Sequence, residues 1–336
     1  MPPALSGDIA VRGRHAKRET IPGLRPNTIP YNQAHHRFAV FLASATFLLI
    51  IAGALVTSND AGLSVPDWPT SFGSLWKLPP MVGGVKFEHG HRMLAEVVGL
   101  LTIVMAVWTQ KVDCRRWMRA LGWGALGAVL VQGILGGITV LRFLPWTIST
   151  AHATLGQTFL CLVIIMAVAT SRGWIQVDHS LLERNERPGT PALAALAAIL
   201  AWIQLILGAA FRHSGIKLLP HIIGACVVTT VLCWTVVRVL SRYGKVPLLR
   251  RTAELLLALL MIQLWLGFAA YLTRVPWGPD AVEPAFTMVL STVAHVAGGA
   301  LVLASSVVLA IQAARRISVA APHPPVNKTS HSAVTV

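Results

Sequence analysis

The ionisable residues best suited to chemistry stand together in the stretch Phe87-Glu88-His89-Gly90-His91-Arg92, at the mouth of a long apolar run. Ionisable side chains are costly near hydrocarbon, so a cluster at the start of a membrane helix is by default a functional-site hypothesis. Three more histidines, His152, His221 and His295, open later apolar runs in the same way. The four histidines are therefore candidate ligands of a site that the fold must assemble.

The composition predicts a polytopic membrane protein. Of 336 residues, 54% are hydrophobic and only 12% are charged, whereas soluble domains carry about 25% charged residues. The net charge of +15 would suggest nucleic acid in a soluble chain, but in a membrane protein it indicates basic cytoplasmic loops. We therefore expect a lipid bilayer and no nucleic acid as partner. We also expect an uncleaved first membrane helix, because residues 1–37 are polar and basic with no early apolar core.

Eight apolar runs are long enough to span a bilayer, which takes about 20 residues each. They cover Phe38–Thr57, His91–Trp108, Trp117–Leu141, Ser149–Ser171, Ala192–Ala210, His221–Leu240, Ala253–Thr273 and Met288–Ala313. The predicted fold class is thus an all-α polytopic membrane protein with eight transmembrane helices.

The distribution of lysine and arginine predicts the orientation. Of the 28 such residues, 21 fall in the two tails and in the loops after the second, fourth and sixth runs. Positive charge favours the cytoplasmic side, so we expect both termini to be cytoplasmic, in a multi-pass protein of the cell inner (cytoplasmic) membrane. The four histidines would then lie near the outer face.

An internal repeat divides the chain into two four-helix units. The third, fifth and seventh runs contain Gln132-x-x-x-Gly136, Gln204-x-x-x-Gly208 and Gln263-x-x-x-Gly267, and the first run matches only at Gly53. Each unit has an even number of spans, so the copies would be related by an axis along the membrane normal as two pseudo-symmetric four-helix bundles. The predicted organisation is a disordered basic tail (1–37), an N-terminal bundle (38–171), a cytoplasmic linker (172–190), a C-terminal bundle (191–313) and a disordered tail (314–336).

Two histidines facing each other inside one bundle suit the axial positions of a haem iron. Zinc would require three or four ligands per site. The repeat therefore predicts one haem per bundle, between His91 and His152 and between His221 and His295. The plainer alternative for any one of these residues is a hydrogen bond to a neighbouring helix.

Other polar residues at the same level have less certain roles. Arg92 and Arg212 could each pair with a propionate group of a haem. The alternative is that they are cations at the membrane interface. His213, beside Arg212, and His89 receive no assigned role.

Glu88 distinguishes the first site from the second. It stands three residues before His91 and hence on the same helical face, and no other of the four histidines has a carboxylate at that offset. Such a carboxylate could act as a base or stabilise developing positive charge. Its alternative is an acidic residue favoured at a helix N-terminus by the dipole.

These residues resemble those of the haem A synthases, membrane enzymes of cytochrome oxidase assembly. The resemblance rests on Gly62-Leu63-Ser64 leading to Pro66-Asp67-Trp68-Pro69, on Glu88-x-x-His91-Arg92, and on the three later histidines over eight spans. It implies that the first bundle binds the substrate haem O and the second holds a haem B cofactor. It also implies oxidation of a methyl group of haem O to a formyl group, giving haem A, with Glu88 as the catalytic carboxylate.

Two departures from the family pattern stand out. Many members carry a cysteine pair in the first outer loop, around the positions of Val65 and Ser71, and this chain has none there. His221 is followed by Ile222 rather than by an arginine. The first departure puts any thiol-linked reductant exchange at this loop in doubt.

Two other classes of function stay open from the sequence. A dihaem b-type cytochrome that only passes electrons would need the four histidines but not Glu88. A haem transporter would need broken midplane helices or acidic residues deep in the spans, which are not evident. Expected partners of the enzyme are haem O, a haem O synthase, cytochrome oxidase subunits and a second copy of the chain. The electron acceptor and the source of oxygen are left open.

Overall fold

The computed structural model describes residues 31–176, 181–183, 187–276 and 284–319. The predicted tails therefore lie largely outside the described residues. The described elements, in chain order, are α1 (Gln33–Ser58), α2 (Val85–Val112), α3 (Arg116–Leu141), α4 (Trp146–Ala169), α5 (Arg172–Ile175), β1 (Leu181–Glu183), α6 (Thr190–Arg212), α7 (Leu218–Tyr243), α8 (Pro247–Arg274), α9 (Phe286–Arg316) and β2 (Ile317–Val319).

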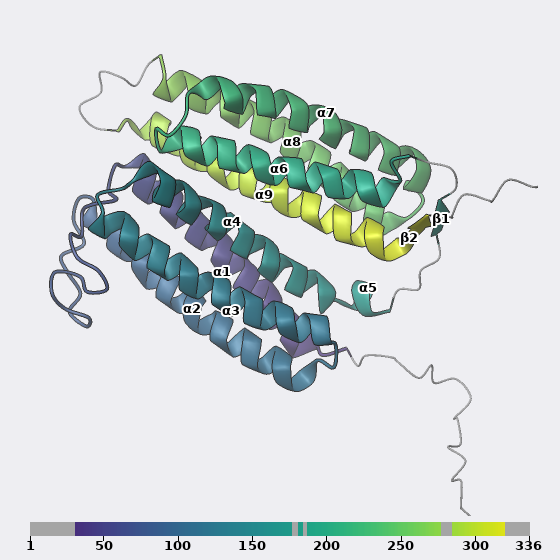
Figure 1. The fold of residues 1–336 in the computed structure, drawn as a ribbon, viewed down its shortest axis with the longest axis horizontal. Coiled ribbons are helices and arrows are strands. Elements are labelled where there is room, and N and C mark those ends of the chain that lie inside the picture. The colour runs from purple at the N-terminus through teal and green to yellow at the C-terminus, as the bar shows by residue number, and fades with distance from the viewer. Residues whose placement is uncertain (1–30, 177–180, 184–186, 277–283, 320–336) are drawn as a thin grey trace, which may run out of the picture.

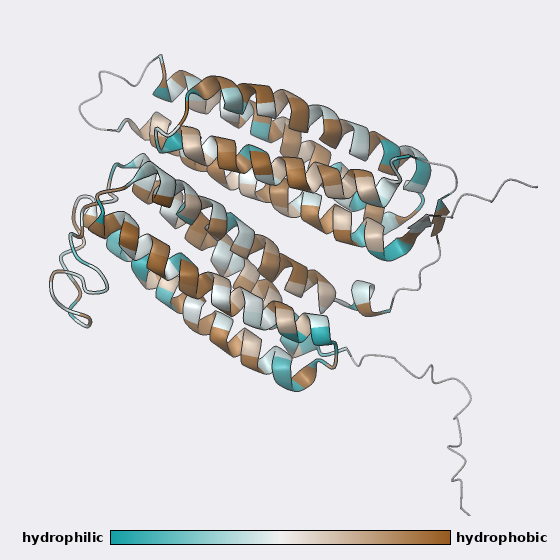
Figure 2. Ribbon diagram, in the orientation of Figure 1, coloured by the Kyte–Doolittle hydropathy of each residue, from teal (hydrophilic) through white to brown (hydrophobic). Residues whose placement is uncertain are grey.

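Eight of the described helices are long and apolar enough to cross a membrane. They are α1 to α4 and α6 to α9, one for each predicted span, so the predicted fold class is confirmed. In each helix, at most 39% of the most apolar stretch is buried inside the protein. The remaining apolar surface faces outward, and in Figure 2 the hydrophobic residues run along the helices while hydrophilic ones gather at their ends. This distribution suits a bilayer, whose core offers no partners to polar groups.

The helices form two sets of four (Figure 1). In the first set α1 and α3 each contact both α2 and α4, and in the second α6 and α8 each contact both α7 and α9. The sets meet where α1 and α4 lie against α9 and where α4 lies against α6. The predicted symmetry between the sets stays a prediction.

Each set has its own apolar core. In the first set Leu42, Met105 and Phe159 are buried in one cluster, and in the second Leu232 and Leu256 are buried in another. Hydrophobic contact with lipid is as favourable as contact with another helix, so close packing of such side chains is what holds membrane helices together. Each cluster lies mainly within one set, but the first also includes Ala300 of α9 and the second Cys161 of α4.

The end of the molecule that carries β1 and β2 differs from the prediction. Residues 314–319, expected in a disordered tail, continue α9 to Arg316 and then form β2. β2 pairs in parallel with β1, which lies in the predicted linker. Glu183 of β1 is buried and accepts hydrogen bonds from the main-chain N–H (2.7 Å) and the hydroxyl (2.6 Å) of Thr190. The linker is therefore attached to the start of α6, a contact that no local sequence pattern indicates. At the other tail, residues 33–37, also expected to be disordered, already belong to α1.

Candidate functional site

Each of the four histidine rings lies against a glycine of the preceding long helix. A Cβ atom added at that glycine would come within 2.9 to 3.1 Å of the ring Cε1 atom. The pairs are Gly53 with His91, Gly136 with His152, Gly208 with His221 and Gly267 with His295. The glycines of the sequence repeat thus make space for imidazoles rather than only for close helix packing.

The histidines lie deeper than their predicted position at the helix openings. His91 and His152 stand six residues after the first residues of α2 and α4, His221 three residues after that of α7, and His295 nine after that of α9. Glu88 belongs to α2, and α4 begins at Trp146 rather than at Ser149, so the apolar pattern alone placed these helix starts too late. All four histidines remain on the same side of the molecule as the loop between α1 and α2.

In the second set, the rings of His221 and His295 face each other. Their centroids are 6.3 Å apart and their planes are perpendicular. A metal–imidazole bond is ~2.0–2.1 Å long, so two rings on opposite sides of one metal ion have centroids about 6 Å apart. At this separation His221 and His295 could both bind one iron ion. Among the residues that the structure describes, no group of three or more His, Cys, Asp or Glu side chains could hold a metal ion by itself.

The carboxylate of Glu88 joins α2 to the loop before it. It is only 4% exposed. Its Oε1 atom accepts a hydrogen bond from Nη2 of Arg92 at 2.7 Å, and its Oε2 atom accepts one from the main-chain N–H of Val65 at 2.8 Å. Both carboxylate oxygens are therefore engaged in a buried ion pair and a loop contact.

Arg92, predicted to contact a propionate, is also engaged with the loop. Its Nη1 atom donates to the main-chain carbonyls of Asp67 (2.7 Å) and Thr70 (3.1 Å), and its Nη2 atom donates to that of Val65 (3.1 Å). Charge-assisted bonds of this kind are stronger than neutral ones. Glu88 and Arg92 together thus hold the loop segment 65–70 on the mouth of the first set.

The same loop reaches into the first set through Trp68. A Cβ atom at Gly137 would overlap the indole ring of Trp68, so the ring lies directly on α3, next to the glycine that faces His152. Asp67 shapes the turn by accepting hydrogen bonds from the main-chain N–H groups of Phe72 and Gly73, both at 2.7 Å, and from the hydroxyl of Thr70. Although partial burial acts in the opposite direction, these bonds hold the pKa of Asp67 below its ordinary value.

Arg212 connects the two sets at the same end of the molecule. Its Nη2 atom donates to the hydroxyl of Ser58 at 2.7 Å, and Ser58 and Thr292 share a hydrogen bond of 2.9 Å. His213 follows Arg212, and its pKa is lowered to about 4 by burial and by the nearby charges of Arg212, His152 and Arg274. His213 is therefore neutral at physiological pH. His89, the other histidine without an assigned role, shares a hydrogen bond of 3.0 Å with the Ser71 hydroxyl.

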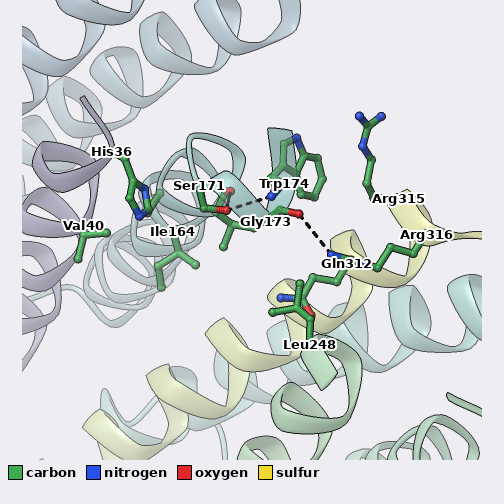
Figure 3. A pocket seen from close by; sticks show the side chains of 12 residues that line it. His36, Val40, Ile164, Ser171, Gly173, Trp174, Leu248, Gln312, Arg315 and Arg316 are labelled. Carbon is green, nitrogen blue, oxygen red and sulfur yellow. Dashed lines mark hydrogen bonds between the residues drawn. The ribbon is translucent and has the colours of Figure 1, made fainter. Parts of the chain in front are cut away.

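A pocket of about 420 Å³ lies at the opposite end of the molecule (Figure 3). It is lined by His36, Trp174, Arg315 and Arg316, among others, and contains none of the four histidines. Arg316 donates to the main-chain carbonyl of Gly173 there, at 3.3 Å. This pocket is separate from the candidate haem sites.

Comparisons with known proteins agree with the predicted resemblance. Residues 85–218 match the family described as "Cytochrome oxidase assembly protein". Relatives named "Heme A synthase" include one from Symbiobacterium thermophilum, 29% identical over 53% of this chain and 59% of its own. Another from Shouchella clausii is 28% identical over 68% of this chain and 74% of its own, and one from Dinoroseobacter shibae is 31% identical over 38% and 35%. The chain thus spans less than two thirds of the length of several of the relatives it matches.

Proposed function

We propose that this protein oxidises a methyl group of haem O to a formyl group, because residues 85–218 match the cytochrome oxidase assembly family and similar proteins are named haem A synthase. The observation that carries this proposal is the set of four histidines, each facing a glycine, at one end of two helix bundles. This donor set suits two haems with two imidazole ligands each.

The two sets of helices would divide the work. His91 and His152 would bind the substrate haem O, beside Glu88 and the loop. His221 and His295 would bind haem B as a resident cofactor, which supplies one-electron transfer. Turning a methyl into a formyl group replaces hydrogen with oxygen and removes electrons, so a redox group near the substrate meets a requirement of the reaction.

Glu88 is the proposed catalytic carboxylate, because its charge lies at the mouth of the substrate site only. To reach a substrate methyl group, Glu88 would exchange the N–H of Val65 for the substrate while Arg92 keeps its other oxygen in place. The substrate propionates would be paired by Arg212 and by Arg92, the latter exchanging loop carbonyls for a carboxylate. Trp68 would cover the site as part of the loop.

The setting of this activity would be the cytoplasmic membrane. Both termini would be cytoplasmic, as the positive charge of the tails favours, and the haem sites would lie near the outer face. Partners would be haem O, a haem O synthase that supplies it and the cytochrome oxidase that receives haem A.

A dihaem electron-transfer cytochrome is the second candidate function. The observation that favours it is that both Glu88 oxygens are engaged in contacts with Arg92 and Val65. A carboxylate that only holds the loop would take no part in a reaction with a substrate.

One experiment separates the two functions. The chain is expressed in membranes together with a haem O producer, and the haems are extracted and separated by mass. Haem A or its hydroxymethyl precursor is expected only when the chain is present. Bound haem B with unchanged haem O would instead support the electron-transfer cytochrome.

A further inference from the structure

Three of the four histidines contact a glutamine carboxamide on the neighbouring helix. Nε2 of Gln263 lies 3.0 Å from Nδ1 of His295. Nε2 of Gln204 lies 3.0 Å from Nδ1 of His221 and also donates to its main-chain carbonyl at 2.8 Å. Nε2 of Gln132 donates to the main-chain carbonyl of His152 at 2.9 Å. The glutamines of the sequence repeat therefore contact the candidate ligand histidines of the neighbouring helices.

These contacts are reciprocal between the paired helices. Each glutamine stands four residues before the glycine that faces the histidine ring, and its own carboxamide lies on a glycine of the histidine's helix. A Cβ atom at that second glycine would overlap or crowd the carboxamide. The second glycines are Gly156 for Gln132, Gly224 for Gln204 and Gly298 for Gln263. We call each such arrangement a glutamine–histidine lock.

His91 lacks both halves of this lock. The position four residues before Gly53 is Leu49, and Leu94 and Ala95 follow His91 where the other histidine helices have glycine. The main-chain carbonyl of Leu49 faces Nδ1 of His91, as the carbonyl of Gln263 faces His295, but within the described residues no side chain bonds this buried atom. His91 therefore lacks the glutamine contact that the other three histidines have.

A hydrogen bond at Nδ1 determines how well an imidazole binds metal. An imidazole that binds through Nε2 carries its proton on Nδ1, and a partner that accepts this proton orients the ring and raises its basicity. Within the part of the chain that the structure describes, Oε1 of Gln263 is buried without a partner, and a half-turn of the carboxamide presents this oxygen to Nδ1 of His295. Nδ1 of His152 lies 3.2 Å from the main-chain carbonyl of Gln132, another acceptor.

We propose that Gln204 and Gln263 are positioning residues that keep His221 and His295 as lasting haem ligands, and that the haem of the first set exchanges because its ligand His91 has no such glutamine. This inference rests on the proposed function, which makes these histidines haem ligands. A substrate haem must enter and leave, whereas a cofactor haem stays, and the missing lock lies in the set proposed to bind substrate.

The first test weakens a lock. In the purified holoprotein, Gln263→Leu is expected to speed haem transfer from the second set to apomyoglobin by about 10–100-fold, the usual effect of losing such a partner. Gln312→Leu is the matched control, since Gln312 is a buried glutamine of α9, the helix that carries His295, and accepts a hydrogen bond from Thr252 instead. Gln263→Glu keeps an acceptor at Nδ1 and is expected to retain the low-spin haem with a lower reduction potential. Transfer as slow in Gln263→Leu as in the control overturns the proposal.

The second test builds a lock. The double variant Leu49→Gln with Ala95→Gly is expected to slow haem loss from the first set by about tenfold or more. The loss is measured by the low-spin electron paramagnetic resonance signal of that haem. An unchanged rate in a folded, haem-loaded variant overturns the role of His91. A wild-type protein that binds both haems but forms no haem A would refute the proposed enzyme while leaving the lock measurable. A wild-type protein that binds no haem would refute both.

Discussion

Glu88 combines two roles at the scale of a single residue, because its buried carboxylate holds the outer loop through Val65 and pairs with Arg92. His91 has this carboxylate three residues before it, whereas His152, His221 and His295 have none at that position. Loop attachment and substrate chemistry can be separated by removing the charge of Glu88 while keeping one acceptor oxygen for the loop.

We expect Glu88→Ala and Glu88→Gln both to abolish haem A formation while haem B stays bound. Glu88→Gln keeps one acceptor oxygen for the N–H of Val65 but loses the ion pair with Arg92, so in this variant the loop contact through Val65 remains while the charge is missing. The measurement is extraction of haems after growth with a haem O producer. Glu96→Ala, which removes an exposed carboxylate of the same helix, serves as control, and haem A formed by Glu88→Gln would contradict the catalytic role.

The glycines that face the histidines give a second prediction at this scale. In Gly208→Ala the new Cβ atom would lie 2.9 Å from Cε1 of His221, so the ring must move away from its present position, in which we propose that it binds haem. We expect the haem content of the second set to fall by about tenfold, while the amount of folded protein stays the same because alanine favours a helix. Gly133→Ala is the control, since its Cβ atom would meet nothing within 4 Å. Full haem content in Gly208→Ala would contradict the fit of the site.

At the scale of elements, the ion pair between Asp113 and Arg115 joins the end of α2 to the start of α3. Nη2 of Arg115 lies 2.6 Å from Oδ2 of Asp113, and Nη1 donates to the main-chain carbonyl of Ala169 at the end of α4 at 3.0 Å. Burial would raise the pKa of Asp113, but the hydrogen bonds and charge of Arg115 hold it below the ordinary value of 3.8. Three helices of the first set are thereby tied at the end away from the histidines.

This ion pair predicts a pH dependence of stability. Because the pKa of Asp113 is lower in the folded state, the pair stabilises the fold fully above pH 3.8, and this contribution disappears as the pH falls through the lowered pKa. At neutral pH, Asp113→Asn is expected to lower the free energy of unfolding by about 0.2–1 kcal/mol. Thermal unfolding in detergent should show the two proteins converging on acidification. A gap that is constant with pH would contradict the assignment.

At the scale of the whole molecule, the two helix sets repeat one arrangement with different additions. Both have histidines facing glycines, but only the first has the ion-paired Glu88, the loop with Trp68, and a histidine without a glutamine. Arg212 and Ser58 connect the sets close to these sites. Such a shared frame would let one set keep its haem while the other exchanges it.

This division predicts unequal effects of removing the ligands. We expect His221→Ala and His295→Ala each to remove the spectrum of the resident haem B, and His91→Ala to remove less of it. The reason is that His91 would bind the exchanging substrate. Reduced-minus-oxidised difference spectra of the purified variants measure the loss, and an equal loss for all three would contradict the division of labour.

The sequence by itself determined the eight spans and their order. Hydropathy over about 20 residues is a local property, and an apolar run of that length is long enough to cross the hydrocarbon core of a bilayer. It also marked His91, His152, His221 and His295, since a repeat places equivalent residues at equivalent depth. The haem ligation of these residues and the catalytic role of Glu88 stay predictions. The same repeat contained the signal for Gln132, Gln204 and Gln263, although their role was not evident without their partners.

Only the tertiary structure decided which groups these residues meet. The bonds of Glu88 and Arg92 to the outer loop, the indole of Trp68 on Gly137, the carboxamides on the histidine helices and the pairing of β1 with β2 all join segments that are distant in sequence or packed across a helix interface. Such contacts depend on how side chains fill the space between elements, and hydropathy and spacing carry no information on that. The structure thereby distinguished His91, which has no glutamine, from the three histidines that have one.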